Sequence, residues 1–151
     1  MITVRLHFLD EAGNEATKDN SRSHPCIWMR YAFETLTDHG ETGHTLPIEG
    51  WAQIDWPGHD CEILADRIPA GVHADRLGAT NFCKLAIEFL DATGTNHVVP
   101  VQATVMVVQN SPPFDVAIGR AFFLDAHRWE DERGGSWLTF RPPPPTYLDF
   151  V

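Results

Sequence analysis

The chain has few basic residues and very few lysines. Of its 151 residues, 11 are Lys or Arg and 21 are Asp or Glu, which gives a formal net charge of −10 at pH 7. Lys18 and Lys84 are the two lysines, and each half of the chain carries more acidic than basic residues. Proteins that bind nucleic acid or anionic membranes present clustered Lys and Arg side chains, so the composition excludes both classes of partner.

Cysteine is scarce as well, and the chain lacks a long apolar run. The chain has an odd number of cysteines, Cys26, Cys61 and Cys83, and no CxxC spacing. Both observations argue against a disulfide framework. No segment approaches the ~18 consecutive apolar residues of a membrane span, and the first residues do not follow the pattern of a signal peptide. We therefore expect a reducing, cytoplasmic environment.

Hydrophobic and aromatic residues are abundant enough to build one core. They make up 43% and 11% of the chain, and a solvated, disordered chain has no use for that much aromatic surface. A chain of this length is expected to form one domain, which we place at residues 1–140. Residues 141–151 differ, because four consecutive prolines favour polyproline II over a sheet. They predict a stiff, proline-rich tail that contacts either its own domain or a partner.

Alternating and β-branched segments predict a mainly β fold. The clearest hairpin joins residues 84–90 to residues 97–109 through a turn at residues 91–96. Further strands are predicted at residues 2–9, 50–55, 114–118 and 137–140, and at residues 26–33, where a helix is also compatible. Residues 63–77 predict a short helix or a pair of strands, and residues 121–129 predict one short C-terminal helix.

Two segments resemble those of single-domain retropepsin-like aspartic peptidases. Residues 52–61, Ala-Gln-Ile-Asp-Trp-Pro-Gly-His-Asp-Cys, have the pattern of a strand that ends in Asp before a turn with Gly. Residues 114–124, Phe-Asp-Val-Ala-Ile-Gly-Arg-Ala-Phe-Phe-Leu, are similar to the apolar-apolar-Gly-Arg segment and the following short helix of that family. The resemblance covers residues 1–140. It implies an open β-barrel and a homodimer in which each subunit supplies one catalytic Asp.

The resemblance assigns the catalytic role to Asp55, with Gly58, Gly119 and Arg120 as structural residues near the site, and it implies neither a cofactor nor a metal. Two adjacent carboxylates share one proton, so that one activates water while the other protonates the substrate carbonyl. The family turn is Asp-Thr-Gly or Asp-Ser-Gly, whereas a bulky Trp and a Pro follow Asp55 here.

This departure leaves two interpretations of the function. The chain is either a weak aspartic endopeptidase that acts as a homodimer on peptide substrates, or a catalytically degenerate subunit of the same fold that binds a protein partner.

A third interpretation depends on charge alone. An acidic protein can act as an inhibitor or decoy that occupies the basic surface of a partner, and such binding weakens steeply as salt rises.

A second Asp turn is a competing candidate for the catalytic motif. Residues 91–95, Asp-Ala-Thr-Gly-Thr, look like the family motif with one residue inserted. They lie too close to Gly119 in the sequence to leave room for the flap hairpin that the family places between these two features. Asp, Gly and Asn are common turn formers, so we predict a plain hairpin turn at this position.

Three other groups of polar residues have simple structural interpretations. Residues 38–44 hold two His and two acids, but their glycines predict an exposed loop instead of a metal site. Adjacent residues of a strand point to opposite faces, so His59 and Cys61 predict a structural Cys and not a nucleophile with its base. Arg120 is either solvated or paired with an acid, which is Asp115 or a residue across a dimer.

Overall fold

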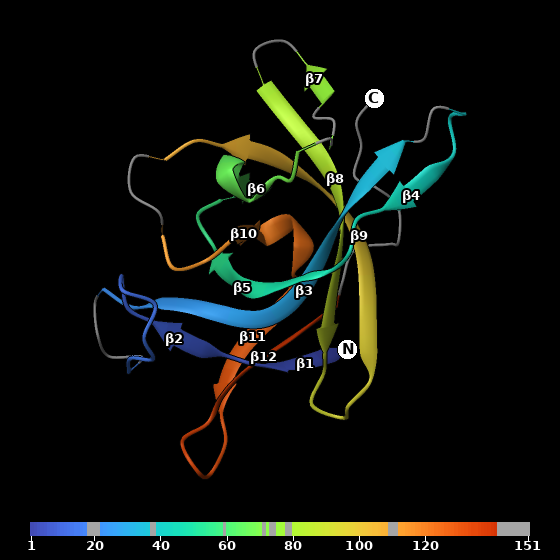
Figure 1. Ribbon diagram of the computed structural model, residues 1–151. Coiled ribbons are helices and arrows are strands. Elements are labelled where there is room, and N and C mark those ends of the chain that lie inside the picture. Colours follow the sequence, from blue (N-terminus) through green and yellow to red (C-terminus); the bar gives the residue numbers. More distant parts are fainter. Residues whose placement is uncertain are drawn as a thin grey trace.

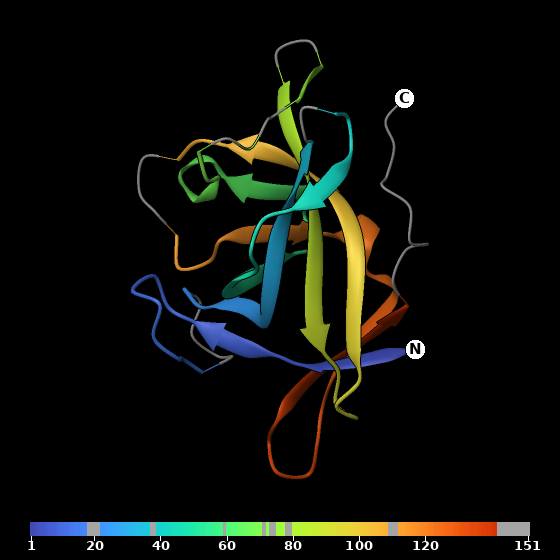
Figure 2. The same cartoon turned by 45° about the vertical axis from the view of Figure 1, so that its right-hand side comes forward.

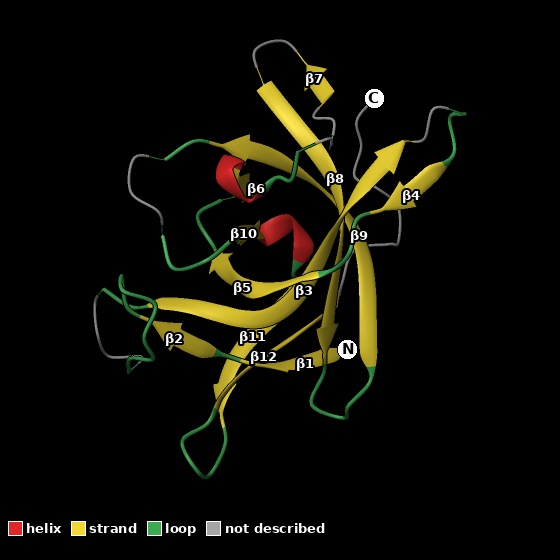
Figure 3. Ribbon diagram, viewed as in Figure 1, coloured by secondary structure: helices red, strands yellow, loops and turns green. Residues whose placement is uncertain are grey.

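The computed structural model is mainly β (Figure 3) and describes residues 1–17, 22–36, 39–58, 60–70, 72, 75–77, 80–108 and 112–141. Its strands are β1 (Ile2–Arg5), β2 (His7–Leu9), β3 (His24–Leu36), β4 (Thr42–His44), β5 (Ile48–Asp55), β6 (Cys61–Leu64), β7 (Asp75–Leu77), β8 (Thr80–Leu90), β9 (Asn96–Met106), β10 (Val116–Gly119), β11 (Leu124–Glu130) and β12 (Ser136–Arg141). Two 3-10 turns, η1 (Ala65–Arg67) and η2 (Arg120–Phe122), are the helical elements of the described ranges. Neither these turns nor any other described segment forms a helix with the length and hydropathy of a membrane span.

Six strands close into a barrel in the order β3-β5-β10-β6-β9-β8 (Figure 1). The ring closes because the second half of β3 pairs with β8, in a register that places Tyr31 opposite Ile87. The sequence predicted an open barrel, and this long-range pairing corrects it. The closed barrel is compatible with the retropepsin-like fold that the sequence resembles.

The strand β10 joins the two halves of the barrel. It runs parallel to β5 on one side and antiparallel to β6 on the other, and all four of its residues are buried. The strand β6 is in turn parallel to β9. Parallel neighbours have no direct hairpin between them, so segments that are distant in the sequence meet at β10.

A smaller sheet, β1-β12-β11, crosses the barrel at its lower end (Figure 2). Its central strand contributes Phe140, which is fully buried. The ring of Phe140 lies 4.9 Å from that of Phe123 and 6.0 Å from that of Phe89, measured between centroids. This aromatic contact binds the small sheet to the barrel, because buried aromatic side chains contribute large apolar areas.

The predicted central hairpin is confirmed as β8 and β9. The side chains of Cys83, Leu85, Ile87 and Phe89 on β8 are buried, and Val99, Val101 and Ala103 on β9 face the same core. Buried residues at every second position are what a strand with one face against a core requires. Alternation in the sequence was therefore a reliable guide to this pair.

Three hairpin turns share one construction, Asp-x-x-Gly-x, and begin at Asp10, Asp91 and Asp131. In each turn the Asp carboxylate accepts hydrogen bonds from the backbone N–H groups two and four residues later, at 2.8–3.0 Å. The Gly at the fourth position has a φ between 79° and 85°, which favours glycine. The segment 91–96 is thus the plain hairpin turn that its composition predicted.

The predicted C-terminal helix does not form. Residues 120–122 make the turn η2, and β11 begins at Leu124 and pairs with β12. Asp125 has a φ of 50°, which an α-helix does not accommodate. The hydrogen bonds gained along β12 override the local helix tendency of this segment. The predicted tail, apart from Arg141 at the end of β12, lies outside the described residues.

The Asp115 side chain connects the start of β10 to two other elements, η1 and β3. Its carboxylate accepts hydrogen bonds from Arg67 Nε at 2.8 Å and from the buried Tyr31 hydroxyl at 2.9 Å. Burial, and then the charge of Asp115, raise the pKa of Tyr31. The sequence allowed an ion pair between Asp115 and Arg120; in the structure Arg67 takes that place and Arg120 is exposed.

Substitution of Gly50 tests whether the position of the Asp115 side chain contributes to stability. A Cβ at position 50 would overlap Asp115 Oδ2, so we expect Gly50→Ala to lower the free energy of unfolding by about 1–3 kcal/mol. Gly43→Ala on β4 is the matched control, because the nearest atom to its Cβ is the Thr35 hydroxyl at 3.2 Å. Equal urea midpoints for the two variants would contradict the role given to Asp115.

The Asp turns predict a loss of stability in acid. The Thr93 hydroxyl and then His97 lower the pKa of Asp91, and the Trp137 indole N–H followed by the Gly135 N–H lower that of Asp131. A lowered folded-state pKa means that these carboxylates stabilise the fold above the unfolded value of about 3.9, and that this contribution is lost as the pH falls below it.

We expect Asp91→Asn to melt at a lower temperature than the wild type at pH 7, and this difference to shrink as the pH falls from about 3.9 to about 2, because the carboxylate of the unfolded wild-type chain then takes up a proton. Thermal unfolding followed by circular dichroism measures both values. Glu132→Gln, at an exposed position, is the control for the loss of one charge. A deficit that stays the same at both pH values would refute the interpretation.

Candidate functional site

Asp55 is the last residue of β5 and lies beside Gly119 on β10. The two residues are partners in the parallel pairing of these strands. Along β5, Gly50, Ala52 and Ile54 are buried, whereas Asp55 is partly exposed on the opposite face. The strand therefore ends where the sequence predicted, and its last carboxylate is directed away from the core.

The turn after Asp55 is held against the end of β10. The Gly58 N–H donates to Asp55 Oδ1 at 3.3 Å, and the Arg120 N–H donates to the Gly58 carbonyl at 2.9 Å. A Cβ at position 58 would lie 2.5 Å from Asp55 Oδ2, so the carboxylate occupies the space that Gly58 leaves free. The structure thus brings together all four residues that the resemblance assigned to the site.

Trp56 does not extend freely from this turn. Its side chain is partly buried, and its ring lies 5.9 Å from that of Phe123, measured between centroids. Pro57 is exposed and carries no backbone N–H. The bulky indole that departs from the family turn thus packs partly against the chain's own aromatic core.

The surroundings of Asp55 are acidic. Burial raises the pKa of Glu62 on β6, and the charges of Asp55 and Asp60 raise it further. Glu62 is paired with Ala117, the residue two positions before Gly119 on β10. Sequence reasoning missed Glu62. Its position between the buried Cys61 and Ile63 is the signal of an outward-facing strand residue.

The other candidates lie apart from this site. Thr42–His44 forms β4, which pairs with β3, and both His39 and Glu41 are exposed. Residue 38 of this predicted loop lies outside the described residues. Within the described ranges, no cluster of three or more His, Cys, Asp or Glu side chains is arranged to hold a metal ion.

The three cysteines are buried, free thiols. Burial raises the pKa of Cys26 and Cys83 to about 12 and that of Cys61 to about 11. Such thiols remain protonated near neutral pH and are poor nucleophiles. This agrees with the structural role predicted for Cys61, while His59 lies outside the described residues.

Thiol accessibility checks this conclusion. We expect the native chain to react with a thiol reagent at pH 8 at least about a hundredfold more slowly than the urea-unfolded chain, because each thiol must first be exposed. Free glutathione serves as the reactive control. Rapid modification of one cysteine in the folded protein would contradict its buried, protonated state.

Comparisons with known proteins find no relative of this chain. No family model, curated protein or solved structure matches it. The interpretation of the site therefore depends on the geometry described above.

Proposed function

We propose that the chain has a retropepsin-like fold and supplies Asp55 to the two-carboxylate site of a homodimeric aspartic endopeptidase. The observation that carries this proposal is the position of Asp55. Its carboxylate ends β5, lies beside Gly119 in register, and accepts the Gly58 N–H. A turn held in this way fixes the direction of the carboxylate, and a fixed direction is what a catalytic acid needs.

The reaction needs a second carboxylate, which we assign to Asp55 of a second copy. Two such groups close together share one proton. The ionised carboxylate takes a proton from water as the water oxygen attacks the peptide carbonyl carbon, and the other carboxyl gives its proton to the carbonyl oxygen. The carbon–nitrogen bond then breaks as the leaving amine takes up the proton that the first carboxylate received from water, while the second carboxylate takes a proton from a hydroxyl of the diol. The products are a carboxylic acid and an amine.

A subunit that binds a partner without cleaving it is the second candidate. The turn sequence favours it, because Trp56 and Pro57 stand where the family has a single hydroxyl residue. A hydroxyl in that place can both donate and accept a hydrogen bond, whereas the proline ring does neither and an indole N–H only donates. In this case the fold and the dimer remain while the chemistry is absent.

The cleavage of an unfolded protein near pH 5 tests the first candidate. We expect wild-type chain to cleave it, and Asp55→Asn to be at least about a hundredfold slower, because an amide cannot accept a proton from water. Gly58→Ala, which displaces the same carboxylate, should also reduce the rate. Glu11→Gln, at an exposed position in another turn, is the control.

Analytical ultracentrifugation separates the alternatives. A dimer that cleaves and loses activity in Asp55→Asn supports the endopeptidase. A dimer without activity supports the binding subunit, and a monomer without activity contradicts both. Cleavage that is unaffected by Asp55→Asn removes Asp55 from the site.

A further inference from the structure

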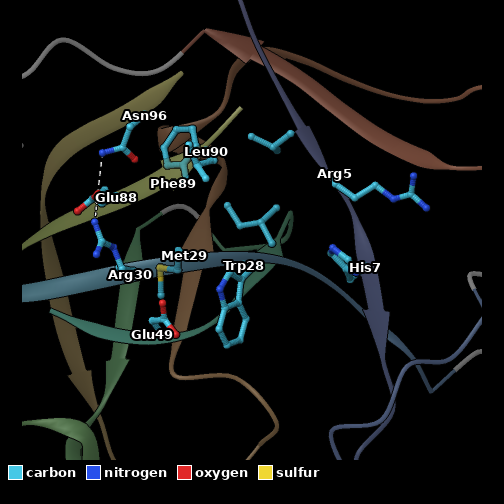
Figure 4. A pocket seen from close by; sticks show the side chains of 12 residues that line it. Arg5, His7, Trp28, Met29, Arg30, Glu49, Glu88, Phe89, Leu90 and Asn96 are labelled. Carbon is cyan, nitrogen blue, oxygen red and sulfur yellow. Dashed lines mark hydrogen bonds and ion pairs between the residues drawn. The ribbon is translucent and has the colours of Figure 1, made fainter. Parts of the chain in front are cut away.

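A pocket of about 440 Å³ opens between the N-terminal strands and the β8–β9 hairpin (Figure 4). Neither Asp55 nor the other residues of the candidate site line it. It exists because β3 has a gap in its pairing. The edge of β3 that faces away from β5 pairs with β2 at residues 24–26 and with β8 at residues 30–33. Within the described ranges, residues 27–29 have no strand partner on this edge.

The pocket has an apolar floor and an aromatic wall. Val4, Ile27, Met29 and Phe89 line it and are buried, whereas Trp28 is 47% exposed. Figure 4 shows the Trp28 indole extending from β3, with Glu49 on the neighbouring β5. A pocket of this volume is within the size range of ligand sites.

The two arginines that line the pocket are engaged with other side chains. Arg30 is bound to Glu88, and this contact together with the Asn96 side chain lowers the pKa of Glu88, so its carboxylate stays charged. Arg5 lies over the Trp137 ring at 5.2 Å, and its charge helps to lower the pKa of Asp131.

Glu49 is left as the unmatched charge of the pocket. Its side chain is exposed, and it makes no hydrogen bond or ion pair with another described residue. The residue opposite it in the β3–β5 register is Arg30, whose guanidinium is bound to Glu88 instead. The rim of the pocket therefore combines a free carboxylate with the half-exposed indole of Trp28, whose ring lies 4.8 Å from that of Trp51, measured between centroids.

We propose that this pocket binds the side chain of a lysine in an extended basic peptide. The ammonium group lies over the Trp28 ring and against Glu49, where cation–π attraction and charge act together. The lysine methylenes cover the apolar floor, since such stems bury readily along apolar surface. Peptide groups next to the lysine pair with the free edge of residues 27–29, as in strand addition.

The charge of the whole molecule supports this partner. A net charge of −10 attracts a basic peptide over long range and repels an acidic one. The inference goes beyond the proposed peptidase function and does not require it, because binding in this pocket needs no catalytic carboxylate.

Titration of the ¹⁵N-labelled full chain, followed by NMR, tests the proposal with two matched peptides. The first is acetyl-Ala-Lys-Ala-methylamide, and the second has norleucine, which keeps the methylenes and lacks the ammonium group. We expect the lysine peptide to shift the Trp28 indole signal and the amides of residues 27–29. The norleucine peptide should bind about tenfold more weakly.

Single variants locate the binding. Trp28→Ala and the nearly isosteric Glu49→Gln should each weaken the lysine peptide about five- to tenfold. Trp129→Ala and Glu132→Gln, which change an exposed Trp and an exposed Glu outside the pocket, should bind as the wild type does. The same holds for Asp55→Asn, so the result is independent of the proposed catalysis.

Three results would overturn the proposal. They are equal binding of the norleucine peptide, signal shifts that leave residues 27–29 and the Trp28 indole unchanged, and the absence of binding by either peptide. If Trp28→Ala disturbs the strand, Glu49→Gln still tests the proposal. An unchanged affinity of this variant for the lysine peptide would show that Glu49 does not bind the ammonium group.

Discussion

The pairing of β10 with β5 and β6 is the interaction on which the candidate site depends. It lays four buried residues of β10 between a parallel and an antiparallel neighbour, and it places Gly119 beside Asp55. Asp115 sets the start of this strand through Arg67 and Tyr31. At the other end, the Arg120 N–H holds the turn that follows Asp55. A shift of β10 by one residue would separate Asp55 from Gly119 and reverse the faces of the strand.

The acidic residues that dominate the composition have several distinct roles. Asp10, Asp91 and Asp131 close hairpin turns by accepting backbone N–H groups. Asp115 is neutralised by Arg67 inside the fold. These carboxylates are structural, because each is held by hydrogen bonds within the fold. Among the other acidic residues, the two proposals use Asp55 with its neighbour Glu62, and Glu49.

The two proposed sites are at opposite ends of one strand. Glu49 is near the start of β5 and Asp55 ends it, a separation of about 20 Å at 3.3 Å per residue. The site at Asp55 arises where β5 meets β10, whereas the lysine pocket arises where β3 lacks a partner between β2 and β8. An extended peptide of about six residues has the length to reach from one to the other. Chemistry and recognition can therefore be separated on the same scaffold.

The sequence by itself determined the local features of this protein. Alternation predicted β8 and β9, turn-forming residues predicted the turn at residues 91–96, and the Gly turn after Asp55 marked the end of β5, because these features depend on neighbours within a few residues. It also pointed to Asp55 and Gly119, although only through a resemblance. The partners of these residues were beyond its reach.

Tertiary structure decided whatever depends on distant partners. The closure of the barrel comes from β3 pairing with β8, and the segment after Gly119 became β11 because β12 offered it hydrogen bonds. Asp115 forms its ion pair with Arg67 instead of Arg120. Glu62 lies close enough to Asp55 for their charges to interact. The pocket beside Trp28 also depends on distant partners, because it is formed by a gap between strands that pair with β3. Local patterns do not specify such pairings, because the contacts join residues far apart in the chain.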